Sequence, residues 1–348
     1  MRKGSYAVLL LPVLLGFGLA RNVPTATRPG AYSTVSGRAY NSEAGLPVEP
    51  YEGLDEAKVA KQQYNPLKLL EFNPTGSADL LRERELAYQY YSHIPGVVWI
   101  DRNLYIDETE VANIHWLEFR RATGRGPQRT FPGMPADYAS NPKFRFYPVV
   151  GVSYQDAQAF CAWRSEVVTQ AYNEKKGYQP ADKDYAVFRF RLPSEAEWGK
   201  CAAGGLDTRR YPHGFTALKA PVKFSAVAGA YLAPLTRQGL AAAALQQRLD
   251  AFTKNKEQDY LVNCRRDEHA FLNLTVPLQV WSNPANQFGI YNLLGNVAEM
   301  LSAEGMAAGG SWLDLLDACR LDSRQHYDGP QANLGFRYVC TFERPDQP

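Results

Sequence analysis

The chain is poor in the residues that many enzyme active sites use, with five cysteines and five histidines among 348 residues. The histidines are scattered and form no His-x-x-x-His pair, which disfavours a non-haem iron centre of the facial-triad type. The sequence also lacks a glycine-rich phosphate loop and a Gly-x-Ser-x-Gly nucleophile elbow. A net charge of +2, with 21% charged residues, gives no electrostatic reason to expect nucleic acid or an anionic membrane as a partner.

The first 160 residues contain no cysteine, since the first one in the chain is Cys161. Residues 1–20 combine a basic start, an apolar stretch over 7–15 and a small-x-small ending at Ala20, which predicts a signal peptide. A retained membrane anchor is the alternative, although the apolar run is shorter than the roughly 20 residues that span a bilayer. No cysteine follows this run to carry a lipid. We therefore expect an exported protein, periplasmic or secreted, with no membrane span after cleavage.

The remaining composition is that of a loop-rich globular protein, with 45% hydrophobic residues, 27 glycines and 23 prolines. Residues 21–84 are rich in Pro, Gly and Ser and predict an N-terminal extension. Residues 85–345 form the expected domain. It carries an insertion over 216–258 that is rich in Ala and Leu and is expected to be helical.

Local patterns predict several regular elements in this domain. Residues 97–106 are expected to be extended with a turn near 101–103, and the alternation over 188–192 predicts a half-buried strand. Capping-box patterns at 153–156 and 194–197 predict the starts of two helices. Asn113 is the expected N-cap of a further helix.

Several motif blocks follow one another in a fixed order. They occupy residues 105–113, 149–157, 191–198 and 288–299, followed by Gly309-Gly310-Ser311-Trp312 and then Gly335-Phe336-Arg337. Together these blocks resemble the formylglycine-generating (sulfatase-modifying factor) family. The resemblance implies an α+β fold, similar to C-type lectins, with few regular elements and long loops.

The same resemblance bears on catalysis, because the family holds copper with two cysteines that stand five residues apart. Here those positions are Asp314 and Cys319, so one thiol is missing. Ser311 and Arg320 match family pocket positions, whereas Ala298 and Met300 stand where tryptophans line that pocket. One thiolate and one carboxylate should hold Cu(I) weakly. Bound copper is therefore not expected, and the chain is expected to be a non-catalytic member.

A calcium site is the second candidate. Asn292, Gly295, Val297 and Glu299 lie in a turn-rich segment that can direct side-chain and backbone oxygens to one point, and such hard ligands suit Ca²⁺. The matching family positions bind a structural calcium ion. The alternative is a buried asparagine and glutamate that hydrogen bonds satisfy.

The resemblance also implies a disulfide. Cys201 stands at the position of a family half-cystine whose partner directly follows the Gly-Phe-Arg motif. Tyr338 occupies that partner position here, and Cys340, two residues on, lies on the same side of a strand. A Cys201–Cys340 bridge is therefore expected, with two buried thiols as the alternative.

These observations favour an exported interaction or assembly module with protein partners in the bacterial cell envelope. Residues 107–119 look like the branch of the family found in gliding motility and type IX secretion. One rival is a copper-dependent formylglycine-generating oxidase that uses Cys319 together with either Cys264 or a thiol of a second chain. A second rival is a calcium-dependent ligand-binding module.

Overall fold

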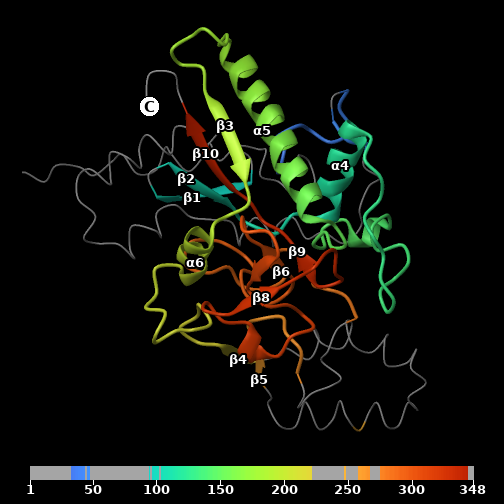
Figure 1. The fold of residues 1–348 in the computed structure, drawn as a ribbon, viewed down its shortest axis with the longest axis vertical. Coiled ribbons are helices and arrows are strands. Elements are labelled where there is room, and N and C mark those ends of the chain that lie inside the picture. The colour runs from blue at the N-terminus through green and yellow to red at the C-terminus, as the bar shows by residue number, and fades with distance from the viewer. Residues whose placement is uncertain are drawn as a thin grey trace, which may run out of the picture.

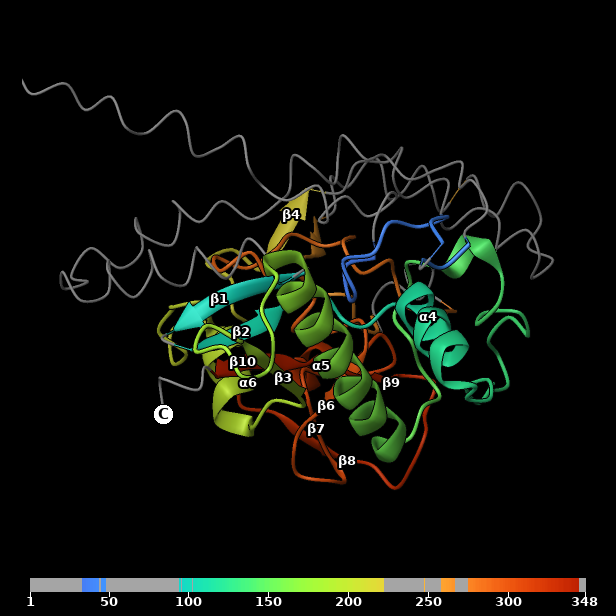
Figure 2. The same cartoon turned by 90° about the horizontal axis from the view of Figure 1, so that it is seen from above.

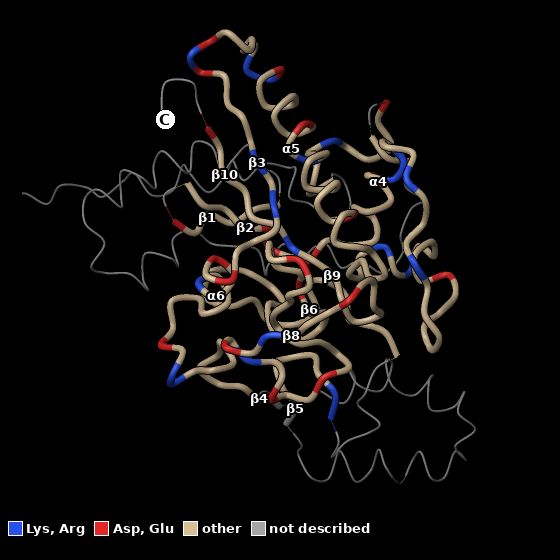
Figure 3. Tube along the Cα trace, viewed as in Figure 1, with Lys and Arg blue, Asp and Glu red and all other residues tan. Residues whose placement is uncertain are grey.

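The computed structural model describes residues 33–43, 45–47, 94, 96–101, 103–221, 247, 258–266 and 275–343 (Figure 1). The expected signal peptide over 1–20 lies outside these residues, as do most of the expected extension over 21–84 and most of the insertion over 216–258. Within the described part, no helix has the length and apolar character needed to cross a membrane. Basic and acidic positions are interspersed over the described trace in this view (Figure 3).

A four-stranded antiparallel sheet forms one half of the domain. Its order is β1 (Val97–Asp101), β2 (Leu104–Asp107), β10 (Val339–Glu343) and β3 (Val187–Arg191). The expected extended segment with its turn is therefore the β1–β2 hairpin, and the alternating segment is β3. Residue 188 is buried and residue 189 exposed in β3, which is the pattern of a strand with one solvated face.

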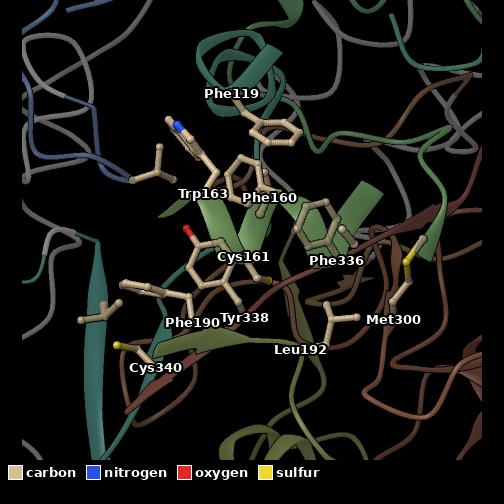
Figure 4. Packing of buried hydrophobic residues seen from close by; sticks show 14 of the residues in the cluster. Phe119, Phe160, Cys161, Trp163, Phe190, Leu192, Met300, Phe336, Tyr338 and Cys340 are labelled. Carbon is tan, nitrogen blue, oxygen red and sulfur yellow. The ribbon is translucent and has the colours of Figure 1, made fainter. Parts of the chain in front are cut away.

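Helix α5 (Tyr154–Lys176) crosses one face of this sheet, with α4 (Asn113–Thr123) beside it (Figure 2). Both capping boxes are confirmed: Ser153 caps α5, and Ser194 caps α6 (Glu195–Ala203). Between α5 and the sheet lies an aromatic core centred on Phe160 (Figure 4). The Phe160 ring centroid is 5.3 Å from Phe119 and 5.5 Å from Phe336, both edge to face, the preferred aromatic geometry.

Helix α6 packs on the opposite face of the sheet. Residues of β1, β2 and β10 alternate between the two faces, so that Val98, Ile106 and Val339 join Trp198 and Cys201 of α6 in a second hydrophobic cluster. The alternation along these three strands thus serves two separate cores.

A second sheet forms the other half, in the order β8 (Arg324–His326), β7 (Met306–Ala308), β6 (Ala298–Met300) and β9 (Leu334–Gly335). The β6–β9 pair is parallel and the others antiparallel. Strands β4 (Lys219–Pro221) and β5 (Gln258–Tyr260) pair as a ribbon that joins the two ends of the insertion. Short 3-10 helices η3 (Pro142–Phe144) and η5 (Leu316–Ala318) complete the described elements.

Residues 33–36, which belong to the expected N-terminal extension over 21–84, pack against the domain. Ser33 and Ser36 are buried, and each donates its hydroxyl to the carboxylate of Glu118, at 2.5 and 2.6 Å. Val35 lies in the aromatic core. The segment is polar, but hydrogen bonds satisfy its hydroxyl groups, so its burial carries little penalty.

The start of α4 differs from the sequence prediction. Its N-cap is Ala112 rather than Asn113, and the His115 ring performs the capping because Ala112 N–H donates to Nδ1 at 3.2 Å. Nδ1 therefore carries no proton, and Nε2–H donates to the Thr34 hydroxyl at 2.8 Å. Burial, with the nearby charge of Arg164, lowers the pKa of His115 from its usual 6.5 to about 3.

Candidate functional site

The loop over 309–320 forms the candidate site, and two glycines hold it against the domain. Gly309 and Gly310 have φ of +94° and +66°, a region that favours glycine. A Cβ on Gly310 would stand 2.6 Å from the Cys319 sulfur, so no larger residue fits there without movement. The backbone N–H of Trp312 donates to the Asn296 carbonyl at 2.9 Å, which fixes the loop to the segment before β6.

Asp314, which the resemblance predicts at the first thiolate position, is held inside the loop. Its carboxylate accepts the Ser311 hydroxyl, and the Asn333 amide donates to the same hydroxyl oxygen at 3.0 Å. Ser311 is fully buried. The leucines on either side, Leu313 and Leu315, are instead 41% and 39% exposed. The loop therefore turns a carboxylate inward and two apolar side chains outward.

Cys319 is fully buried and lies beside a second thiol, that of Cys264. Their hydrogen bond, together with burial, raises the pKa of Cys319 far above its ordinary value, and the charge of Asp314 acts in the same direction. Parallel bridges pair Asn263 with Gly295 and Arg265 with Leu315, and they fix the backbone on both sides of Cys264. The Cys319 thiol is consequently kept protonated, the opposite of what a thiolate ligand requires.

Arg320 does not join this group. Its guanidinium forms a two-point ion pair with Asp322, with Nε–Oδ1 2.9 Å and Nη2–Oδ2 3.0 Å, at the protein surface. Of the four predicted site residues, the structure therefore brings Ser311, Asp314 and Cys319 together and leaves Arg320 outside.

Both side chains of the predicted calcium set, Asn292 and Glu299, are engaged by other groups of the protein. The Asn292 amide donates to Val280 O and Glu110, whereas its oxygen accepts from Asn283. The Glu299 carboxylate accepts from the Trp198 indole at 2.9 Å and from Arg337. A calcium ion at these positions would have to displace a guanidinium from Glu299, so the donor set does not fit the ion. Among the described residues, no three His, Cys, Asp or Glu side chains gather as metal ligands.

Arg337 is the centre of a buried polar network that the sequence did not reveal. The side chain is fully buried and donates to Glu299 at 2.8 Å, to the Asp107 carbonyl at 2.9 Å and to the Tyr291 carbonyl at 2.6 Å. Its guanidinium also lies 3.9 Å from Glu110. Burial raises the pKa of Glu110 to about 8, and the charge of Arg337 opposes that rise. The network connects the first sheet, the 288–299 segment and β6.

The expected Cys201–Cys340 bridge is wrong, because both residues are free thiols. Cys340 shares a face with Tyr338, as expected, but that face meets α5. Cys201 on α6 meets the opposite face, where Val339 lies. The sheet therefore separates the two sulfurs.

Comparison with known proteins places these features in a family context. The family described as "Sulfatase-modifying factor enzyme 1-like domain" matches residues 83–342. The chain is 25% identical over 284 residues to the inactive C-alpha-formylglycine-generating enzyme 2 of Bos taurus, covering 75% of this chain and 73% of the relative. It is 32% identical over 99 residues to the formylglycine-generating enzyme of Streptomyces coelicolor, covering 28% of this chain and 22% of that enzyme.

Among solved structures, the chain resembles that of PvdO from Pseudomonas aeruginosa. The TM-score is 0.41 and the identity 19%, with 70% of this chain and 82% of that chain covered.

Proposed function

Because the chain belongs to the sulfatase-modifying factor enzyme 1-like family, we propose that it is a non-catalytic member, exported to the bacterial cell envelope, where it acts as an interaction or assembly module. The observation that carries this proposal is Asp314, which stands where the family places its first copper-binding thiolate. The bovine relative, which matches over most of its length, is itself named inactive.

The donor set at the loop does not fit copper. Cu(I) is a soft ion that selects thiolates. The loop itself supplies one thiol, Cys319, and a carboxylate, Asp314, that already accepts the Ser311 hydroxyl. The Cys319 thiol is buried and protonated, and so it would have to lose both its proton and its hydrogen bond with Cys264 to bind a metal.

The outward side of the same loop supports an interaction role. Among the described residues, the large hydrophobic side chains that are exposed are Leu117, Leu313 and Leu315. Two of these three flank Asp314. Exposed apolar side chains on a rigid loop are typical of protein contacts. A role in gliding motility or type IX secretion would use this surface to hold an envelope partner.

Two measurements test the proposal. Purified reduced protein, supplied with copper and oxygen, should form no aldehyde on cysteine-containing peptides; aldehyde formation would refute the non-catalytic assignment. Envelope partners that cross-link to the wild type should be lost in the Leu313→Ser and Leu315→Ser variants. They should be retained in Leu117→Ser, which removes an equally exposed leucine on α4. Equal retention in all three variants would refute the loop as the contact surface.

A copper-dependent oxidase is the second candidate, and one observation favours it: the Cys264 thiol lies within hydrogen-bond reach of Cys319. These two sulfurs would replace the missing loop thiolate. The candidate requires tight copper binding that Cys264→Ser abolishes and Cys161→Ser, which changes a buried thiol in the other core, leaves intact. If neither the wild type nor Cys161→Ser binds copper, this candidate fails.

A further inference from the structure

Two cysteines that are distant in the sequence, Cys264 and Cys319, lie side by side in the structure. Cys264 follows β5, and Cys319 lies near the end of the 309–320 loop, more than 50 positions later. The two residues are 1% and 0% exposed, belong to one hydrophobic cluster and share a hydrogen bond between their side chains. The interaction role proposed above uses neither thiol.

The backbone around this pair is already joined. Arg265 N–H donates to the Asp314 carbonyl at 2.7 Å, and a parallel bridge pairs Arg265 with Leu315. Cys319 follows directly on η5, where its own N–H donates to the Leu316 carbonyl at 2.9 Å. A disulfide requires two backbones that stand close, because its bond lengths and torsion leave little freedom. The joined backbones and the meeting side chains provide that approach.

The other three cysteines have different surroundings. Cys161 and Cys340 lie in the aromatic core between the sheet and α5. Cys201 belongs to the same cluster as Cys264 and Cys319, but it lies on α6. Burial raises the pKa of all three thiols, and the charged groups that modify this rise include no second cysteine. Hydrogen-bonded thiols are therefore a feature of the Cys264 and Cys319 pair.

Burial determines when this pair can react. The thiolate, and not the thiol, is the nucleophile in disulfide exchange. The hydrogen bond with Cys264, together with burial, raises the pKa of the Cys319 thiol far above its ordinary value. In the folded protein the pair is consequently unreactive and out of reach of an oxidant in solution. A bond between the two sulfurs has to form while the chain folds, and the same burial then protects it from reductants.

We propose that Cys264 and Cys319 are an oxidation site, at which a disulfide joins the 309–320 loop to the segment that follows β5. One cysteine thiolate attacks the disulfide of an external oxidant and releases one thiolate of that oxidant. The second cysteine thiolate attacks the mixed disulfide and releases the other. Two protein thiols are oxidised, and the oxidant disulfide is reduced to two thiols, which take up the two protons. In the cell this step rests on the proposed function, because export brings the chain to an oxidising compartment.

The bond would have two consequences for the loop. It removes both sulfurs from metal chemistry, because a disulfide offers no thiolate, and the copper-dependent candidate is then confined to the reduced protein. It also fixes the base of the loop on which Leu313 and Leu315 are exposed. An interaction surface on a fixed loop loses less conformational entropy when a partner binds.

The test refolds the denatured and reduced full chain in a buffer of oxidised and reduced glutathione. Free thiols are then trapped with N-ethylmaleimide in denaturant, and unreduced peptides are mapped by mass spectrometry. We expect one linked pair of peptides, containing Cys264 and Cys319, with the other three cysteines alkylated. The proposal is overturned if Cys264 and Cys319 are both alkylated, or if either is linked to a different cysteine. Because refolding in a tube needs no export, this failure is distinguishable from a failure of the proposed localisation.

Thermal unfolding gives a second measurement. The oxidised wild type should melt roughly 10 °C above the reduced wild type, because the bond closes a loop of more than 50 residues in the unfolded chain. Cys161→Ser, which changes a buried thiol in the other core, should keep this difference. Cys264→Ser and Cys319→Ser, refolded in the same buffer, should each abolish it. A difference that persists in both of these variants would overturn the assignment.

Discussion

Replacing Arg337 with methionine is the change to which the fold should be most sensitive. The guanidinium is fully buried, touches Glu299 at 2.8 Å and lies 3.9 Å from Glu110. Methionine fills most of the volume but leaves two buried carboxylates without a cation and two backbone carbonyls without a donor. Breaking a buried ion pair from one side costs about 3–5 kcal/mol, a large part of the 5–15 kcal/mol that stabilises a typical domain.

The assay is urea unfolding at pH 8 and pH 5, with the midpoint and slope measured separately. Without the cation, the burial that raises the pKa of the Glu110 carboxyl in the folded state loses the charge that opposes it, and Glu299 becomes a second buried carboxylate without a cation. Their unfavourable contribution is therefore largest at high pH and shrinks as they become protonated. We expect a loss near about 4 kcal/mol at pH 8 and a smaller loss at pH 5.

The double variant Arg337→Met/Glu299→Met, compared with the single variants, forms a double-mutant cycle. Removing both partners eliminates one uncompensated charge, so the double variant should recover part of the stability that the Arg337→Met variant loses. A loss below about 1 kcal/mol in the single variant, or additive losses in the double variant, would refute the reasoning.

Three further predictions concern pH, thiols and calcium. The folded pKa of His115, about 3, lies below the unfolded 6.5, so its contribution to stability is full above pH 6.5 and is lost as the pH falls. Wild type should therefore lose about 2 kcal/mol more than His115→Gln between pH 7 and pH 5 in urea unfolding. Cys201 and Cys340 should both be alkylated when the protein is denatured without reductant and mapped by mass spectrometry. Calcium at about 1 mM should leave the Tm unchanged, because Arg337 occupies the Glu299 carboxylate.

Each of these three predictions would be contradicted by one specific result. Parallel stability curves for wild type and His115→Gln would mean that the histidine is accessible to protons in the folded state. A linked peptide containing Cys201 and Cys340 would contradict the separation of the two cores. A rise of the Tm with calcium, reversed by chelator, would restore the predicted site at Asn292 and Glu299.

Local chemistry explains which elements were predictable. The starts of α5 and α6 depend on serine and an acidic residue three positions later, so Ser153 and Ser194 identify them without tertiary information. The start of α4 was missed by one residue because the His115 ring, rather than the Asn113 side chain, performs the capping. The Asn113 side-chain oxygen instead accepts the Gln128 amide, a contact across 15 residues.

Long-range partners explain the remaining differences. Alternation along β10 correctly placed Tyr338 and Cys340 on one face, but it does not say which helix covers that face. The composition of residues 21–84 predicted an extension, but it could not show that residues 33–36 pack on the domain, because the Glu118 carboxylate that accepts two of their hydroxyls lies more than 80 positions away. Glu299 was grouped with its neighbours in sequence, although its partner Arg337 is 38 residues distant.

In the proposed function, Asp314 in place of a thiol leaves the 309–320 loop unable to hold copper. Titration of Cu(I) into the reduced wild type and an Asp314→Cys variant, with a chromophoric competitor, tests it most directly. The wild type should stay empty, and the variant, which restores two thiols on one loop, should bind one copper ion tightly. Tight binding of one copper ion by the wild type would contradict the account.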